Sequence, residues 1–128
     1  MRSILLIGAG GFCGAIARYA TARWADTLVD GRFPLGTFVV NVSGSFLLGL
    51  LGGVLAARLV PQGDNLRLAL GVGFLGAFTT FSTFEMETHA LLEDGAWMPA
   101  SANIVLSVVA GLLALRAGLV LAKAWFGG

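Results

Sequence analysis

The chain has 128 residues, of which 57% are hydrophobic and 12% are charged, and its mean hydropathy is +0.88. These values indicate an integral membrane protein and exclude a water-soluble enzyme, while the balance of 8 Lys and Arg against 7 Asp and Glu excludes a basic nucleic-acid-binding surface. A membrane-spanning helix needs roughly 20 apolar residues, so four spans would nearly fill one membrane domain, residues 1–128.

Charges and turn-forming residues gather in three short stretches that separate longer apolar ones. We therefore predict an all-α protein with four transmembrane helices, at about residues 4–24, 35–57, 66–88 and 99–124. The connections are short, so neighbouring helices should run antiparallel. Trp24, Trp97 and Trp125 fall at the predicted helix ends, where an indole ring is stable at the level of the lipid headgroups.

The first helix carries small residues and one charge on a single face. Gly10, Gly14 and Arg18 recur every four residues, which places them along one side of a helix. Arg18 is a fixed positive charge inside the span, and two interpretations of it stay open. It could attract anions, or it could anchor the helix by reaching the interface or bonding to carbonyl groups.

The second helix repeats this arrangement with polar members. Asn41, Ser45, Gly49 and Gly53 recur every four residues and form one polar and small face. Such a stripe is typical of close helix packing, in which Asn and Ser form hydrogen bonds between helices. Together with similar stripes on other helices, it also favours a polar path through the membrane.

The third helix contains the segment GAFTTFSTFEME, residues 76–87. Phe78, Phe81 and Phe84 recur every three residues, a spacing that ordinarily indicates core packing. However, the edge of a phenyl ring is electropositive and can stabilise a small anion where water is excluded.

A break in the third helix is expected in the same segment. Gly71, Gly73 and Gly76 weaken the helix, and the hydroxyl groups of TTFST can bond to their own backbone. Carbonyl groups freed at membrane depth must meet another helix, water or a cation.

The fourth helix carries Asn103, Ser107 and Gly111 on one face, and this stripe makes Asn103 and Ser107 candidates for an anion pathway. The stripes offer amide and hydroxyl donors, and no carboxylate or lysine until the helix ends. A cation path or a proton-coupled carrier would normally show acidic residues deep in the membrane. Donors without acids therefore favour an anion.

The distribution of basic residues leaves the orientation weakly specified. The side of the termini carries five of them (Arg2, Arg58, Arg67, Arg116 and Lys123), and the other side carries three (Arg18, Arg23 and Arg32). Either the termini are cytoplasmic by a small margin, or the chain inserts both ways and functions as an antiparallel pair. We favour the pair, because it would supply the two-fold symmetry that inverted repeats give to many transport proteins.

Three motifs resemble those of the Fluc (CrcB) family of bacterial fluoride channels: GGFCGAIARY, GTFVVNVSGSFLLG and GFLGAFTTFSTF. The resemblance covers nearly the whole chain. It implies four-helix subunits with a broken third helix, which form antiparallel, dual-topology homodimers in the bacterial inner (plasma) membrane. It also implies that each dimer has two pores, which export fluoride passively and exclude chloride.

The resemblance implies roles for residues along the anion pathway. Phe81 and Phe84 match the phenylalanines whose ring edges meet fluoride, and Asn41 matches the asparagine of the pore. Ser82 and Thr83 match the hydroxyl groups beside the rings.

Further implied residues lie on either side of the rings. Glu87 matches the family's acidic residue after the motif, although Glu85 stays possible in its place. Gly76 and Thr79 match the positions whose backbone carbonyls bind a structural Na⁺ at the centre of the dimer.

Other classes of protein fit the sequence less well. The alternative is a small dual-topology, proton-coupled transporter of the multidrug type, which would need a carboxylate within the membrane, and the first, second and fourth predicted helices contain none. A purely structural subunit would leave the Phe and hydroxyl segment without a function. We do not expect an enzyme, because His89 is the sole histidine and no metal site or catalytic triad can be assembled around it.

Overall fold

The computed structural model describes residues 1–57 and 61–126, which form helices joined by turns. Four helical runs are long and apolar enough to span a membrane: α1 (Arg2–Asp26), α2 (Leu35–Ala56), the run Gly63–Glu93 and α6 (Trp97–Phe126). The prediction of four transmembrane helices is confirmed, although the third begins earlier and ends later than predicted. Arg58, which was counted in the charge distribution, lies outside the described residues.

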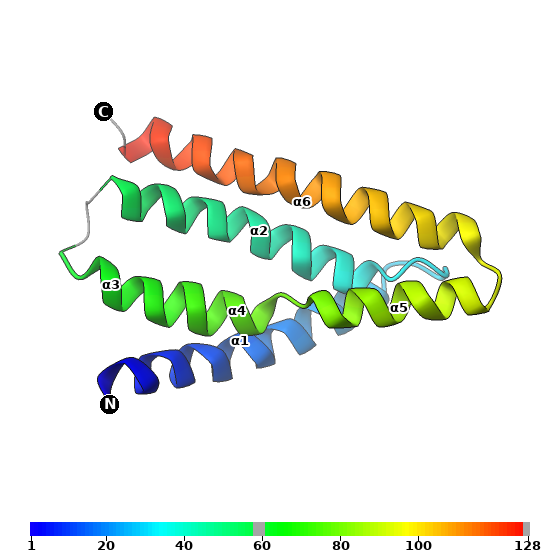
Figure 1. Ribbon diagram of the computed structural model, residues 1–128, viewed down its shortest axis with the longest axis horizontal. Helices are drawn as coiled ribbons and strands as arrows, with labels where there is room; N and C mark the ends of the chain where they lie inside the picture. Colours follow the sequence, from blue (N-terminus) through cyan, green and yellow to red (C-terminus); the bar gives the residue numbers. More distant parts are fainter. Residues whose placement is uncertain (58–60, 127–128) are drawn as a thin grey trace.

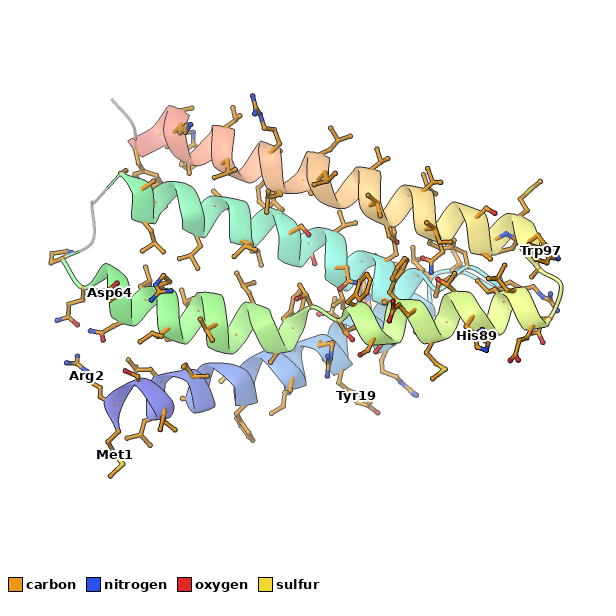
Figure 2. The ribbon with its side chains drawn as sticks, viewed as in Figure 1. Met1, Arg2, Tyr19, Asp64, His89 and Trp97 are labelled. Carbon is orange, nitrogen blue, oxygen red and sulfur yellow. The ribbon has the colours of Figure 1, made fainter. Side chains whose placement is uncertain are left out.

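Successive spans run antiparallel, as Figure 1 shows. The N-terminus and the last turns of α6 lie at one end of the bundle, and the connection from α5 (Phe81–Glu93) to α6 lies at the other. Figure 2 places Arg2 and Asp64 at the first end and Trp97 at the opposite end, so two charged residues and one indole mark the two sides of the membrane.

The third span consists of four helical pieces. α3 (Gly63–Leu66) leads into a π-helix, η1 (Arg67–Leu75), which is followed by the short α4 (Gly76–Phe78) and then by α5. The sequence did not predict the π-helix. It runs beside α1 and close against it, because a Cβ atom on Gly73 would lie 2.7 Å from the carbonyl oxygen of Ile7.

The predicted break lies at Thr79 and Thr80, near the middle of the bundle's length (Figure 1). Thr79 has φ −82° and ψ 155°, and Thr80 has φ −151° and ψ 111°, so both residues are extended. Thr80 then caps α5, since its hydroxyl oxygen accepts a hydrogen bond of 3.3 Å from the backbone N–H of Thr83. The second half of the span thus starts at a helix cap that the Thr80 side chain provides.

The turn from α5 to α6 follows from the sequence EDGA. Gly95 has φ 72°, a conformation that suits glycine, and its N–H donates to the carbonyl of Leu92 at 3.1 Å. The N–H of Ala96 donates to the carbonyl of Leu91 at 2.8 Å. Leu91, Ala96 and Ala100 pack as a small buried cluster, which sets the direction in which α6 returns along the bundle.

Glycines bring the helix backbones into direct contact. On α2 and α6, a Cβ atom on Gly49 would overlap the carbonyl of Leu115, and one on Gly118 would overlap the carbonyl of Phe46. Small residues at such positions let membrane helices approach closely and gain van der Waals contact. The glycine part of the α2 stripe is therefore a packing surface.

We expect Gly49→Ala to destabilise the protein by about 1 to 3 kcal/mol, because an added methyl group forces two backbones apart. The matched control is Gly52→Ala, whose Cβ would lie at an ordinary 3.7 Å from Leu119 and should leave stability nearly unchanged. Thermal unfolding in detergent measures both variants. Equal stability of the two would contradict the close contact between α2 and α6.

Candidate functional site

A groove of about 340 Å³ lies where α2, the helix break and α6 meet. We call it the break groove. Its lining brings together polar and aromatic residues from the stripes of α2 and α6 and from the third helix, including Asn41, Ser45, Gly76, Thr79, Thr80, Phe81, Phe84 and Ser107. Four residues predicted for the anion pathway thus share one groove, although they come from three separate helices.

The structure separates the three phenylalanines into two groups. Phe78 is 5% exposed and stacks on Phe74, with ring centroids 5.7 Å apart. Phe81 is 70% exposed, and its centroid lies 5.6 Å from that of Phe84, with the ring planes inclined at 37°. Phe78 is therefore a core residue, while Phe81 and Phe84 form a tilted pair on the groove.

Asn41 lies in the break groove and contacts the break itself. Its Oδ1 atom accepts a hydrogen bond of 2.7 Å from the backbone N–H of Thr80. Its Nδ2 atom donates one of 3.0 Å to the carbonyl of the same residue. One side-chain amide is thus paired with both backbone groups of Thr80.

A second cavity, of about 290 Å³, lies between α1, α2 and the start of α5. We call it the arginine cavity. Its charged and hydroxyl-bearing lining comprises Arg18, Tyr19, Arg23, Asp26, Thr37, Thr80, Thr83 and Glu87. Thr80 borders both cavities, so the break stands between them.

Glu87 is held from α2 inside the arginine cavity. Its Oε1 atom accepts a hydrogen bond of 2.8 Å from the hydroxyl of Thr37, and its Oε2 atom is buried without a hydrogen bond to another described residue. Glu85, the other acid that the sequence left open, is exposed and borders neither of these cavities. The sequence analysis did not single out Thr37, although its spacing continues the stripe of Asn41 and Ser45 by one turn towards the start of α2.

Asn103 lies in the interior and not on the groove. It is 1% exposed, and its Nδ2 atom donates to the hydroxyl of Thr88 at 2.9 Å. Thr88 in turn donates to the carbonyl of Phe84 at 2.7 Å, so a buried relay joins α6 to the helix that bears the ring pair. Ser107 lines the groove and donates to Asn103 at 3.2 Å. The sequence did not predict this role of Thr88, because Thr88 belongs to none of the predicted stripes.

The break diverts two backbone donors from their helical acceptors. In a continuous helix the N–H of Thr80 would donate to the carbonyl of Gly76, and the N–H of Thr83 to that of Thr79. Here Thr80 donates to Asn41, and Thr83 donates to the hydroxyl of Thr80. The carbonyls of Gly76 and Thr79 therefore lose their helical partners, and carbonyl oxygens are ligands that hard cations prefer.

Residues 5–119 match the model of a family described as CrcB-like protein, Camphor Resistance (CrcB). The chain belongs to this family. The resemblance drawn from the three motifs is thereby confirmed, and all three lie within the matched residues.

Curated relatives match this CrcB-like chain over nearly its full length, and each is named fluoride-specific ion channel FluC. The protein from Solibacter usitatus is 47% identical over 119 residues, covering 93% of this chain and 97% of the relative. That from Geobacter sulfurreducens is 46% identical over 123 residues, covering 96% and 98%. That from Caulobacter sp. is 41% identical over 126 residues, covering 98% of each chain.

In this CrcB-like protein we expect Asn103 and Thr88 to stabilise the bundle jointly. Their hydrogen bond is buried, and such bonds between membrane helices contribute about 0.6 to 1.7 kcal/mol. A double-mutant cycle of Asn103→Ala and Thr88→Val, followed by unfolding in detergent, should give a coupling energy of that size. Ser101→Ala, on the exposed side of α6, serves as the control and should show no coupling to Thr88→Val. Additive effects of Asn103→Ala and Thr88→Val would contradict the relay.

Proposed function

We propose that this chain forms a fluoride-selective ion channel through which fluoride leaves the bacterial cytoplasm passively across the inner (plasma) membrane. The observation that carries the proposal is the break groove, where a pair of phenylalanine rings meets amide and hydroxyl groups, in a chain 41% to 47% identical to relatives named fluoride-specific ion channels. The described lining of the groove includes no acidic side chain, which suits an anion.

The ring pair would meet the anion at its narrowest passage. A phenyl ring has a negative face and a positive edge, so Phe81 and Phe84, inclined to one another, can present edges to a dehydrated fluoride. One remaining N–H of Asn41 would supply a hydrogen bond in place of water, and the Ser107 hydroxyl would supply another after turning from Asn103 to the anion. A larger halide would gain less from these short contacts, which would favour fluoride over chloride.

The arginine cavity would form the approach to this passage. Arg18 and Arg23 line it together with Asp26 and Glu87, so two positive charges face two carboxylates. Recruitment of the anion by Arg18 therefore rests on the sign of its own charge. Ser82 and Thr83 are exposed at the start of α5, and their hydroxyls donate no hydrogen bond to another described residue. Thr83 lines the arginine cavity, so its hydroxyl is available to an anion that passes by way of Thr80 into the break groove, whereas Ser82 borders neither cavity.

A second copy of the chain would complete the pore. The break groove is open at the surface of the single chain, and lipid tails cannot form hydrogen bonds with the polar groups that line it. We propose that an antiparallel partner covers it, so that a homodimer with dual topology holds two equivalent pores. The nearly even distribution of basic residues supports insertion in both orientations.

A structural Na⁺ would bind at the centre of this dimer. The chemistry of the break fits the ion, because the carbonyls of Gly76 and Thr79 have lost their helical donors. The ion would supply positive charge to carbonyl groups that otherwise face a medium without water. The two residues of each subunit would hold it through their backbone, and their side chains would not be required.

The transporter alternative is not favoured. A proton-coupled multidrug carrier requires an acidic residue within the membrane. α2 and α6 contain none, α1 contains only Asp26, its last residue, and Glu87 of α5 is hydrogen-bonded to Thr37. The relatives cited above are likewise named as channels and not as carriers.

Liposomes loaded with KF or KCl and treated with valinomycin will test selectivity, and we expect rapid efflux of fluoride and little of chloride. Phe81→Ile or Phe84→Ile should slow fluoride efflux by about two- to tenfold, since aromatic contacts contribute roughly 0.5 to 1.5 kcal/mol. Phe12→Ile is the matched control, because Phe12 is 71% exposed on α1, away from both cavities. Equal rates for the two anions would refute the channel proposal, and efflux that depends on a proton gradient would indicate a carrier.

Replacing Na⁺ by N-methylglucamine should destabilise the purified dimer. A ligand that binds only the folded state stabilises it by about 1.4 kcal/mol for each tenfold rise in concentration above its dissociation constant. The melting temperature should therefore rise with Na⁺ concentration and fluoride efflux should fail without Na⁺. K⁺ at the same ionic strength controls for screening of surface charge. A melting temperature that is indifferent to Na⁺ would exclude the cation site.

A further inference from the structure

The side chain of Asn41 forms two hydrogen bonds with the peptide groups at the helix break. Both are made to Thr80, one to its N–H at 2.7 Å and one to its carbonyl at 3.0 Å. Asn41 lies on α2, distant in sequence from the segment it binds, so the contact forms only when α2 packs against the third span. At most one N–H of the amide is left for an anion.

At the break, these two bonds replace the helical hydrogen bond that the backbone N–H of Thr80 loses and add a partner for its carbonyl. An extended residue in the middle of a membrane helix leaves an N–H and a carbonyl that neither lipid nor the adjoining turns can satisfy. A carboxamide has the same donor and acceptor as a peptide group, so Asn41 can pair with both. Its backbone is itself fixed within α2, where its carbonyl accepts from the hydroxyl of Ser45 at 2.8 Å.

The same contact acts on both sides of the break. Because the N–H of Thr80 is bound to Asn41, it does not return to the carbonyl of Gly76, which stays free. Thr80 is also the capping residue of α5, so its position sets where that helix begins and where Phe81, the next residue, is placed.

We propose that Asn41 is the positioning residue of the break, and that its amide couples the freed carbonyls to the ring pair. It does so by holding Thr80 in its extended conformation, in addition to any contact that it makes with an anion. The functional part of this inference rests on the proposed fluoride channel and its Na⁺ site. The hydrogen-bond part stands on the geometry alone and is tested separately.

Amide hydrogen exchange, resolved at residue 80, measures the hydrogen-bond part in the full-length protein in detergent. We expect Asn41→Ala to accelerate exchange of the Thr80 amide about tenfold or more, because its acceptor is lost. Asn41→Asp keeps an acceptor of the same length and should retain most of the protection, which makes the test informative even if the alanine variant folds poorly. Ser43→Ala is the matched control, since the Ser43 hydroxyl bonds only within α2.

The Na⁺ dependence of the melting temperature measures the coupling. Asn41→Ala should raise the Na⁺ concentration for half-maximal stabilisation about tenfold, whereas Phe81→Ile should leave it unchanged while slowing fluoride efflux. If Asn41→Ala slows efflux but changes neither exchange at Thr80 nor the Na⁺ dependence, Asn41 is a pore ligand only and the inference is overturned. If the wild-type protein does not select fluoride, the proposed function fails, and the exchange measurement still decides whether Asn41 holds the break.

Discussion

The structure depends on one constraint: a backbone that leaves the helical conformation inside a bilayer must find its hydrogen bonds elsewhere. At the break these bonds come from side chains. Asn41 pairs with both backbone groups of Thr80, and the hydroxyl of Thr80 accepts from Thr83. Before the break, the hydroxyl of Thr79 donates to the carbonyl of Leu75 at 2.9 Å. These side-chain hydrogen bonds stabilise the break within the bilayer, and the break in turn produces the groove, the freed carbonyls and the position of the ring pair.

Much of this arrangement could be predicted from the sequence because its causes are local. Apolar length and interrupting turn residues determine where a chain can cross a membrane, so the four spans were found. The density of hydroxyl groups beside Gly76 indicated where the helix would break, since such side chains compete for backbone hydrogen bonds. The family could likewise be inferred from three motifs, because each is an uninterrupted stretch of sequence within one span.

The remaining features depend on how the helices face one another. Phe78 and Phe81 have the same spacing as Phe81 and Phe84, yet the extended residues between the first pair rotate α5 relative to α4, so Phe78 is buried and Phe81 is not. Asn103 occupies a stripe like that of Asn41, but its partner is Thr88 in the interior. No periodicity in one helix specifies which side chain of another helix will lie opposite. The π-helix of η1 was missed for the same reason, because it packs against α1, where Gly73 meets the backbone of Ile7 and Gly10.

The interruption at Thr79 and Thr80 also has an electrostatic consequence. Each helix has a partial positive charge at its N-terminus and a partial negative charge at its C-terminus, and these charges normally lie in water outside the membrane. A span that is divided in the middle brings one of each into the bilayer: the negative end of α4 and the positive end of α5. A single break therefore creates an environment for a cation on one side and for an anion on the other, without any ionised side chain at the midpoint of the membrane.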